Sequence, residues 1–206
     1  MADPTAFGLG QFRFRWGDHV CAIFEDPEQQ KEIMGQFVAH GLQSVQRCVW
    51  VGPPASARRL RHALAELGAD LPTLEASNQL VIVSEVDFYL QDGLFEPERT
   101  LDLMHLMLDD GRQQGYASMR MTTDLSWLRR GRLDLDIWES YEMRLTEEIR
   151  DLPVVLVCQY DRRQASGSLI VTALRTHPVV ILGDVVHENP FYAPSAEEAA
   201  RAPEIL

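Results

Sequence analysis

Several polar and titratable side chains stand where apolar runs of the sequence end. Asp124 closes one such run, and Gln159, Tyr160 and Asp161 close another. If these runs are parallel strands, their carboxyl ends meet at one edge of a sheet, where α/β proteins bind their ligands. Carboxylates, an amide and an aromatic ring at that edge would suit a small ligand of mixed polarity. Because caps and turns favour the same residue types, a purely structural role is the alternative for each.

The turn after the first apolar run lacks the features of a phosphate-binding loop. Residues 25–32 contain no glycine and four acidic residues, Glu25 among them. A phosphate loop needs glycines, so that backbone N–H groups can surround the anion, followed by Lys and Ser or Thr. GxxxxGK[ST] and GxGxxG motifs do not occur elsewhere in the chain. The sequence therefore disfavours an active nucleotide hydrolase, and acids at this turn would favour a neutral or cationic ligand.

A metal site built from histidine and cysteine is a further hypothesis. His19 and Cys21 lie two apart on a predicted strand and so share one face, and Cys158 with His177 would complete a Cys2His2 set. However, the two histidines precede or begin their strands, whereas Cys158 stands near the end of its own. CxxC and HxxxH spacings are also absent. We therefore expect no metal site, no cofactor, and core positions for the cysteines, including Cys48.

Catalytic motifs are equally sparse. The chain has no GxSxG nucleophile elbow, and nothing in the sequence places Ser126 beside a histidine. Tyr141 and Glu142 fall on one predicted helix, with Tyr141 on its apolar stripe. A buried Glu142 would have a raised pKa and could transfer protons, but an exposed position is the expectation for a glutamate. The sequence thus predicts a protein that is not an enzyme.

The elements that must position these residues alternate along the chain. Short apolar, β-branched runs predict strands at 19–24, 47–51, 79–83, 117–122, 154–160 and 179–182. Amphipathic segments between them predict helices at 27–42, 55–67, 97–114, 135–149 and 168–176. Such alternation indicates a mostly parallel sheet of about six strands inside a three-layer α/β sandwich.

Composition narrows the function classes. The 206 residues fit a single domain, and a net charge of −12 disfavours nucleic acid and anionic membranes as partners. Two arginine clusters, at 58–61 and 129–132, are typical of a solvated surface of mixed charge. A signal peptide and an apolar run long enough to cross a bilayer are both absent from the sequence, so we expect a cytoplasmic location.

Six short segments in order resemble a known family. These are 17–25 (GDHVCAIFE), 123–127 (TDLSW), 141–145 (YEMRL), 158–163 (CQYDRR), 175–178 (RTHP) and 188–192 (ENPFY). Together they are similar to the MEDS domains, sensory domains named for methanogen, methylotroph and dichloromethane-regulator proteins. The resemblance covers about residues 14–195, which leaves an N-terminal extension at 1–13 and an acidic tail at 196–206.

This resemblance implies a RecA/KaiC-like fold without hydrolase machinery and a role in sensing small molecules, including hydrocarbon derivatives or methylated compounds. Asp124 replaces the Glu expected there, which shortens the carboxylate. The implied family positions are His19, Cys21, Asp124, Trp127, Tyr141, Glu142, Gln159, Tyr160, Asp161 and Asn189. To these we add Glu25 and Arg120 as ligand-binding candidates at the sheet edge, with Trp127 as an apolar wall.

The leading hypothesis is a stand-alone sensory domain of a prokaryotic signalling or transcription-regulation system. Because no output module is recognisable in the sequence, the signal would pass to a separate protein partner. Two alternatives remain open: an interaction module that regulates a kinase or a transcription factor, and a residual nucleotide-binding protein. Self-association is also left open, since RecA-like domains often form oligomers.

Overall fold

A computed structural model describes residues 13–130, 134–195 and 200. Nearly all of the expected N-terminal extension and acidic tail lies outside these residues, as does Arg132 of the second arginine cluster. The described residues form a seven-stranded sheet with the order β3-β2-β4-β5-β1-β6-β7. Its strands are β1 (His19–Phe24), β2 (Arg47–Val51), β3 (Leu80–Val83), β4 (Met119–Asp124), β5 (Val154–Asp161), β6 (Val179–Leu182) and β7 (Val185–Glu188).

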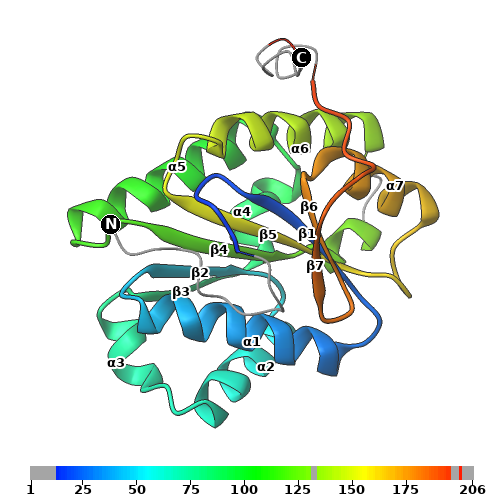
Figure 1. Ribbon diagram of the computed structural model, residues 1–206. Coiled ribbons are helices and arrows are strands. Elements are labelled where there is room, and N and C mark those ends of the chain that lie inside the picture. Colours follow the sequence, from blue (N-terminus) through cyan, green and yellow to red (C-terminus); the bar gives the residue numbers. More distant parts are fainter. Residues whose placement is uncertain (1–12, 131–133, 196–199, 201–206) are drawn as a thin grey trace.

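Helices connect the parallel strands, whereas a turn joins β6 to the antiparallel β7. The helices are α1 (Pro27–Gln43), α2 (Pro54–Glu66), α3 (Leu71–Ala76), α4 (Glu85–Tyr89), α5 (Pro97–Gln113), α6 (Leu135–Ile149) and α7 (Gly167–Thr176), with 3-10 turns η2 (Gln91–Gly93) and η3 (Leu125–Arg130). The predicted three-layer sandwich is confirmed: α1 to α3 cover one face of the sheet, and α5 to α7 cover the other (Figure 1).

Two strand predictions needed correction. The fourth strand begins and ends two residues later than the predicted 117–122, so that Asp124 is its last residue and Arg120 lies near its start. The sequence also missed β7, which pairs antiparallel with β6 through a turn in which Gly183 has a φ of +65°. Of the four β7 residues only Val186 is buried, so the strand lacks an apolar run that would predict it.

Alternation along the strands gives each face its own core. Val20, Ala22 and Phe24 of β1 pack with α1, whereas Cys21 and Ile23 belong to the core on the α6 side. Since successive strand residues point to opposite faces, neighbours in sequence end up on different sides of the sheet. This alternation decides where the candidate site residues lie.

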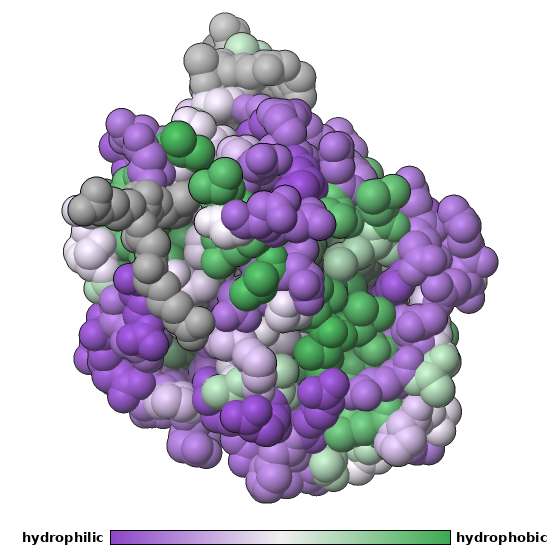
Figure 2. Space-filling model, turned by 180° about the vertical axis from the view of Figure 1, so that it is seen from behind, coloured by the Kyte–Doolittle hydropathy of each residue, from purple (hydrophilic) through white to green (hydrophobic). Residues whose placement is uncertain are grey.

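Hydrophilic residues cover much of the face seen in Figure 2. Viewed from the side opposite to Figure 1, hydrophilic residues surround areas where hydrophobic residues gather (Figure 2). None of the described helices combines the length and the apolar composition that crossing a membrane requires.

Candidate ligand-binding site

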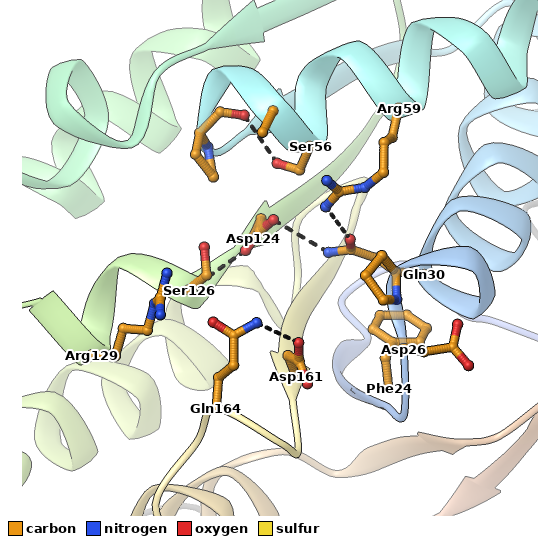
Figure 3. Close-up of a pocket in the computed structure, with 13 residues that line it drawn as sticks. Phe24, Asp26, Gln30, Ser56, Arg59, Asp124, Ser126, Arg129, Asp161 and Gln164 are labelled. Carbon is orange, nitrogen blue, oxygen red and sulfur yellow. Dashed lines mark hydrogen bonds between the residues drawn. The ribbon is translucent and has the colours of Figure 1, made fainter.

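A hollow of about 210 Å³ lies at the carboxyl edge of the sheet, between α1, α2 and η3 (Figure 3). We call it the rim hollow. Nine of its thirteen lining residues are polar or charged, and both signs of charge are present. The lining residues are Phe24, Asp26, Pro27, Gln30, Pro53, Ala55, Ser56, Arg59, Asp124, Ser126, Arg129, Asp161 and Gln164.

Gln30 of α1 connects the elements around the rim hollow. Its amide nitrogen donates to Oε1 of Gln159 over 2.8 Å and to Oδ2 of Asp124 over 3.3 Å. Its amide oxygen accepts a hydrogen bond of 3.0 Å from the guanidinium of Arg59 on α2 (Figure 3). One side chain thereby links α1 to α2, β4 and β5, so a ligand that displaces it would disturb several elements together.

The turn after β1 is not a phosphate loop, as predicted, because a carboxylate caps the helix that follows it. Asp26 is the N-cap of α1, and its carboxylate accepts hydrogen bonds of 2.9 Å from the backbone N–H groups of Glu28 and Gln29. These helix N-terminal amides are the groups that hold a phosphate in a nucleotide hydrolase. Here a carboxylate occupies them and adds negative charge, which opposes phosphate binding.

The two carboxylates at the ends of β4 and β5 line the rim hollow together. Asp124 is buried and accepts a hydrogen bond of 3.0 Å from the backbone N–H of Ser126. It therefore also caps η3, which is the structural role that the sequence analysis gave as the alternative. Burial raises the pKa of Asp161, but hydrogen bonds from Arg163 and Gln164 outweigh this and hold the pKa below its ordinary value. Asp161 is therefore an anion at neutral pH.

The other face of the sheet brings two predicted site residues, His19 and Glu142, together with Cys158 and His177, which were considered from the sequence only as metal ligands. His19 of β1, Glu142 of α6, Cys158 of β5 and His177, which follows α7, form what we call the buried polar cluster. Their ligand atoms all lie within 4.8 Å of one another, and all four residues are buried. Nε2 of His19 is 3.3 Å from Oε2 of Glu142 and 3.4 Å from Sγ of Cys158.

The expectation that His19, Cys158 and His177 stay apart along the strand direction is wrong. β5 runs on to Asp161, so Cys158 lies in mid-strand, and the register sets it beside Cys21, only two residues beyond His19. His177 is brought close at the junction between α7 and β6, and its ring centroid lies 3.9 Å from that of His19. Strand register, which the sequence does not reveal, decides this convergence.

The expectation of an exposed Glu142 is also wrong. Its side chain is fully buried, and burial raises its pKa to about 8. Tyr160, likewise buried, donates a hydrogen bond of 3.2 Å to Oε1 of Glu142. Tyr160 therefore belongs to the α6 face, whereas its neighbours Gln159 and Asp161 point to the α1 face.

Arg120 does not reach the rim hollow. It lies at the start of β4, where its guanidinium donates to Oε1 of Gln46 over 2.6 Å and to the carbonyl of Phe37 over 3.2 Å, and lies 3.0 Å from Nδ1 of His40. Burial lowers its pKa to about 10, which leaves it charged at neutral pH. Arg120 is thus a core contact between β4 and α1, and its prediction as a ligand-binding residue is corrected.

Trp127 and Tyr141 belong to an aromatic core on the α6 face. The Trp127 ring stacks on Tyr89 with centroids 5.0 Å apart, and Tyr141 packs against Trp138 at 5.2 Å. Tyr141 is buried, as its place on the apolar stripe predicted. Trp127 does not line the rim hollow, so the interpretation of it as an apolar wall there is corrected.

Three remaining candidates have local roles. Glu25 is exposed and forms an ion pair of 3.1 Å with Arg162. Cys21 is buried beside the cluster, which raises its thiol pKa. Asn189 donates hydrogen bonds of 2.6 Å to the carbonyl of Leu174 and 2.7 Å to that of His177, so it fixes the backbone that carries this histidine.

Sequence reasoning missed several residues of the rim hollow, above all Gln30 and Arg59. Both lie near the starts of the helices that follow β1 and β2. Because the carboxyl ends of parallel strands share one edge, polar residues early in the following helices could have been counted as candidates.

Comparison with known proteins first gives the class of fold. The KaiC-like protein PH0186 from Pyrococcus horikoshii OT3 superposes with a TM-score of 0.60 at 14% sequence identity, over 82% of this chain and 74% of that protein. At this identity the likeness concerns the fold alone, and it confirms the KaiC-like α/β architecture.

The family follows from the sequence match. The MEthanogen/methylotroph, DcmR Sensory domain (MEDS) matches residues 18–178, so this chain belongs to the MEDS family. The transcriptional repressor DcmR of Methylorubrum extorquens (strain DSM 6343 / CIP 106787 / DM4) is 24% identical over 162 residues, which are 78% of this chain and 58% of the repressor. These matches support a sensory and regulatory role.

Proposed function

We propose that this chain is the ligand-binding part of a sensory system, is not an enzyme, and receives a small molecule of mixed polarity in the rim hollow. The observation that carries the proposal is the convergence of Gln30, Arg59, Asp124 and Asp161 on one hollow at the carboxyl edge of the sheet. Four elements supply these side chains, as is usual for binding sites of α/β proteins.

The size and charge of the rim hollow define the ligand class. A volume of about 210 Å³ corresponds to roughly seven water molecules, so the ligand is a small organic molecule. Asp124 and Asp161 would bind a cationic or hydrogen-donating group, and Arg59 or Arg129 would bind an electronegative one. The sequence alone favoured a neutral or cationic ligand. With the two arginines included, we propose a molecule that carries both a cationic or hydrogen-donating group and an electronegative group.

Signal transmission would run through Gln30. A ligand that takes the place of Gln30 at Asp124 breaks the 3.3 Å contact between them and frees the Arg59 side chain on α2. The relative positions of α1 and α2 would then change, and a partner that contacts these helices would sense it. A ligand shifts this equilibrium only if its affinity differs between the two arrangements.

A ligand screen with matched variants tests the proposal. Methylated amines, haloalkanes and ATP would be screened by thermal shift, and each hit titrated by calorimetry. We expect a hit other than ATP whose affinity falls at least about tenfold in Asp124→Asn and in Arg59→Ala. The control is Asp102→Asn, an exposed aspartate on α5 across the sheet. Equal affinity in all four proteins would refute the rim hollow as the binding site.

A further inference from the structure

The buried polar cluster contains four side chains whose atom types are those of a transition-metal site. It offers two imidazole nitrogens, one thiol sulfur and one carboxylate oxygen, all inaccessible to solvent. The proposed ligand-binding function does not use it, and the rim hollow lies on the other face of the sheet. Burying so many titratable groups is costly unless they are paired or bind a cation.

Hydrogen bonds fix the orientation of His19. The Thr146 hydroxyl lies 2.8 Å from the carbonyl of Thr176 and 3.1 Å from that of Glu142, and carbonyls only accept. The single Thr146 proton therefore goes to a carbonyl, and its oxygen accepts from Nδ1–H of His19 over 2.7 Å. The Nε2 lone pair of His19 then points into the cluster.

His177 is held in the same way. Its Nδ1 lies 2.8 Å from the carbonyl of Ala173, so Nδ1 carries the proton and Nε2 the lone pair. This Nε2 is fully buried and has no hydrogen-bond partner among the described residues, although Oε2 of Glu142 stands 3.5 Å away. Metal-bound histidines usually donate their other N–H to an oxygen acceptor that fixes the ring. Here His19 donates to the Thr146 hydroxyl and His177 to the carbonyl of Ala173.

Four of the six separations between these ligand atoms are close to those of tetrahedral coordination, and all six are within 4.8 Å. Zinc holds nitrogen, oxygen and sulfur ligands at about 2.0 to 2.3 Å, which sets ligand atoms of a tetrahedron about 3.3 to 3.6 Å apart. Oε2 of Glu142 lies 3.3 Å from Nε2 of His19, 3.5 Å from Nε2 of His177 and 3.9 Å from Sγ of Cys158. His19 and Cys158 are 3.4 Å apart.

Charge balance favours a divalent ion. Two neutral imidazoles, a thiolate and a carboxylate carry two negative charges, which one divalent cation cancels, so the occupied site is neutral in its buried setting. Burial lowers the pKa of His177 to about 3, which keeps its imidazole in the neutral form that binds metals. A thiolate together with imidazoles in four-coordinate geometry is typical of zinc.

We propose that His19, Glu142, Cys158 and His177 form a closed binding site for a divalent transition metal of the zinc class. The four ligands come from β1, α6, β5 and the α7–β6 junction, so the metal would join these elements on one face of the sheet. All four positions are filled by protein, as in structural zinc sites. Because the site is sealed, the metal binds as the chain folds.

The metal content of the full chain, produced in medium supplemented with zinc, tests this site. We expect close to one equivalent of zinc after dialysis against a mild chelator. Cys158→Ala should lose it, while Cys48→Ala, an equally buried cysteine on the other face, should keep it. Glu142→Gln replaces the carboxylate with an amide of the same shape, so it retains the fold while losing at least about 90% of the metal.

Cobalt provides a spectroscopic check on the ligands. Cobalt-loaded wild-type protein should show the strong visible bands of tetrahedral coordination and a thiolate charge-transfer band, and the latter should be absent from Cys158→Ala. The proposal is overturned if the wild-type chain holds less than about a tenth of an equivalent of zinc. Retention of zinc in both Glu142→Gln and Cys158→Ala, or its equal loss in Cys48→Ala, would overturn it as well.

Discussion

Nε2 of His19 lies 3.3 Å from Oε2 of Glu142, in an interior that solvent does not reach. One residue is on a strand and the other on a helix distant in sequence, and neither occurs in a recognisable metal or catalytic motif. Because the imidazole presents a lone pair to the carboxyl group, the pair needs a shared proton or a cation between them. The metal-free and metal-bound proteins should therefore respond differently to pH.

Glu142 should make the metal-free protein less stable at alkaline pH. Its folded pKa of about 8 is raised above the ordinary value of 4.5, so its contribution to the free energy of unfolding is complete below about pH 4.5 and lost as the pH rises through about 8. Glu142→Gln lacks this loss. Urea unfolding with chelator present should show similar stabilities near pH 4.5 and a more stable variant near pH 9.

His19, Cys158, Tyr160 and His177 face Glu142 and also titrate. Because wild type and Glu142→Gln both contain these four groups, their titration cancels in the difference between the two stabilities. Saturating zinc should reverse the order, because only the wild-type chain gains binding energy. An unchanged difference between the two proteins from about pH 4.5 to 9 would contradict the raised pKa.

Gly52 should be essential to the shape of the rim hollow. A Cβ at this position would lie 2.8 Å from Cβ of Asp124 and 3.2 Å from Oγ of Ser56. Gly52→Ala should therefore displace Asp124 and destabilise the protein by about 1 to 3 kcal/mol. Gly167→Ala is the control, since its Cβ would meet nothing within 4 Å. Equal unfolding midpoints for the two variants would contradict this account.

Arg120 should matter for stability and not for ligand binding. Arg120→Met removes the donor to Gln46 and to the carbonyl of Phe37 in the interior, which should lower the free energy of unfolding by roughly 2 to 4 kcal/mol. Exposed Arg58→Met should change it by less than about 0.5 kcal/mol. At a temperature where Arg120→Met is folded, its affinity for the ligand should equal that of wild type. A loss of affinity beyond about tenfold would show that Arg120 contributes to ligand binding.

The sequence predicted the fold well because its signals are local. Apolar runs predicted β1 and β6 at their true limits, and the amphipathic segment predicted at 27–42 begins where α1 begins, at Pro27. β7 was missed because only one of its side chains is buried, so its position depends on pairing with β6 and not on a pattern of its own.

The candidate site was predicted as one group and is in fact divided. Gln159 and Asp161 point to the face of α1, whereas Tyr160 between them contacts Glu142 of α6. A list of residues at strand ends does not separate the two faces unless alternation is applied to each strand. The proximity of His19 and Cys158 depends on the register of β1 against β5, which no local pattern encodes.

The most direct test of the proposed sensory function is the map of amide chemical-shift changes when the best hit of the ligand screen is titrated into the labelled protein. We predict that the largest changes fall on residues of the rim hollow and on α1 and α2, centred on Gln30, Arg59, Asp124 and Asp161. Changes confined to the aromatic core around Trp127 and Trp138, or spread evenly over the surface, would contradict ligand binding at the rim hollow.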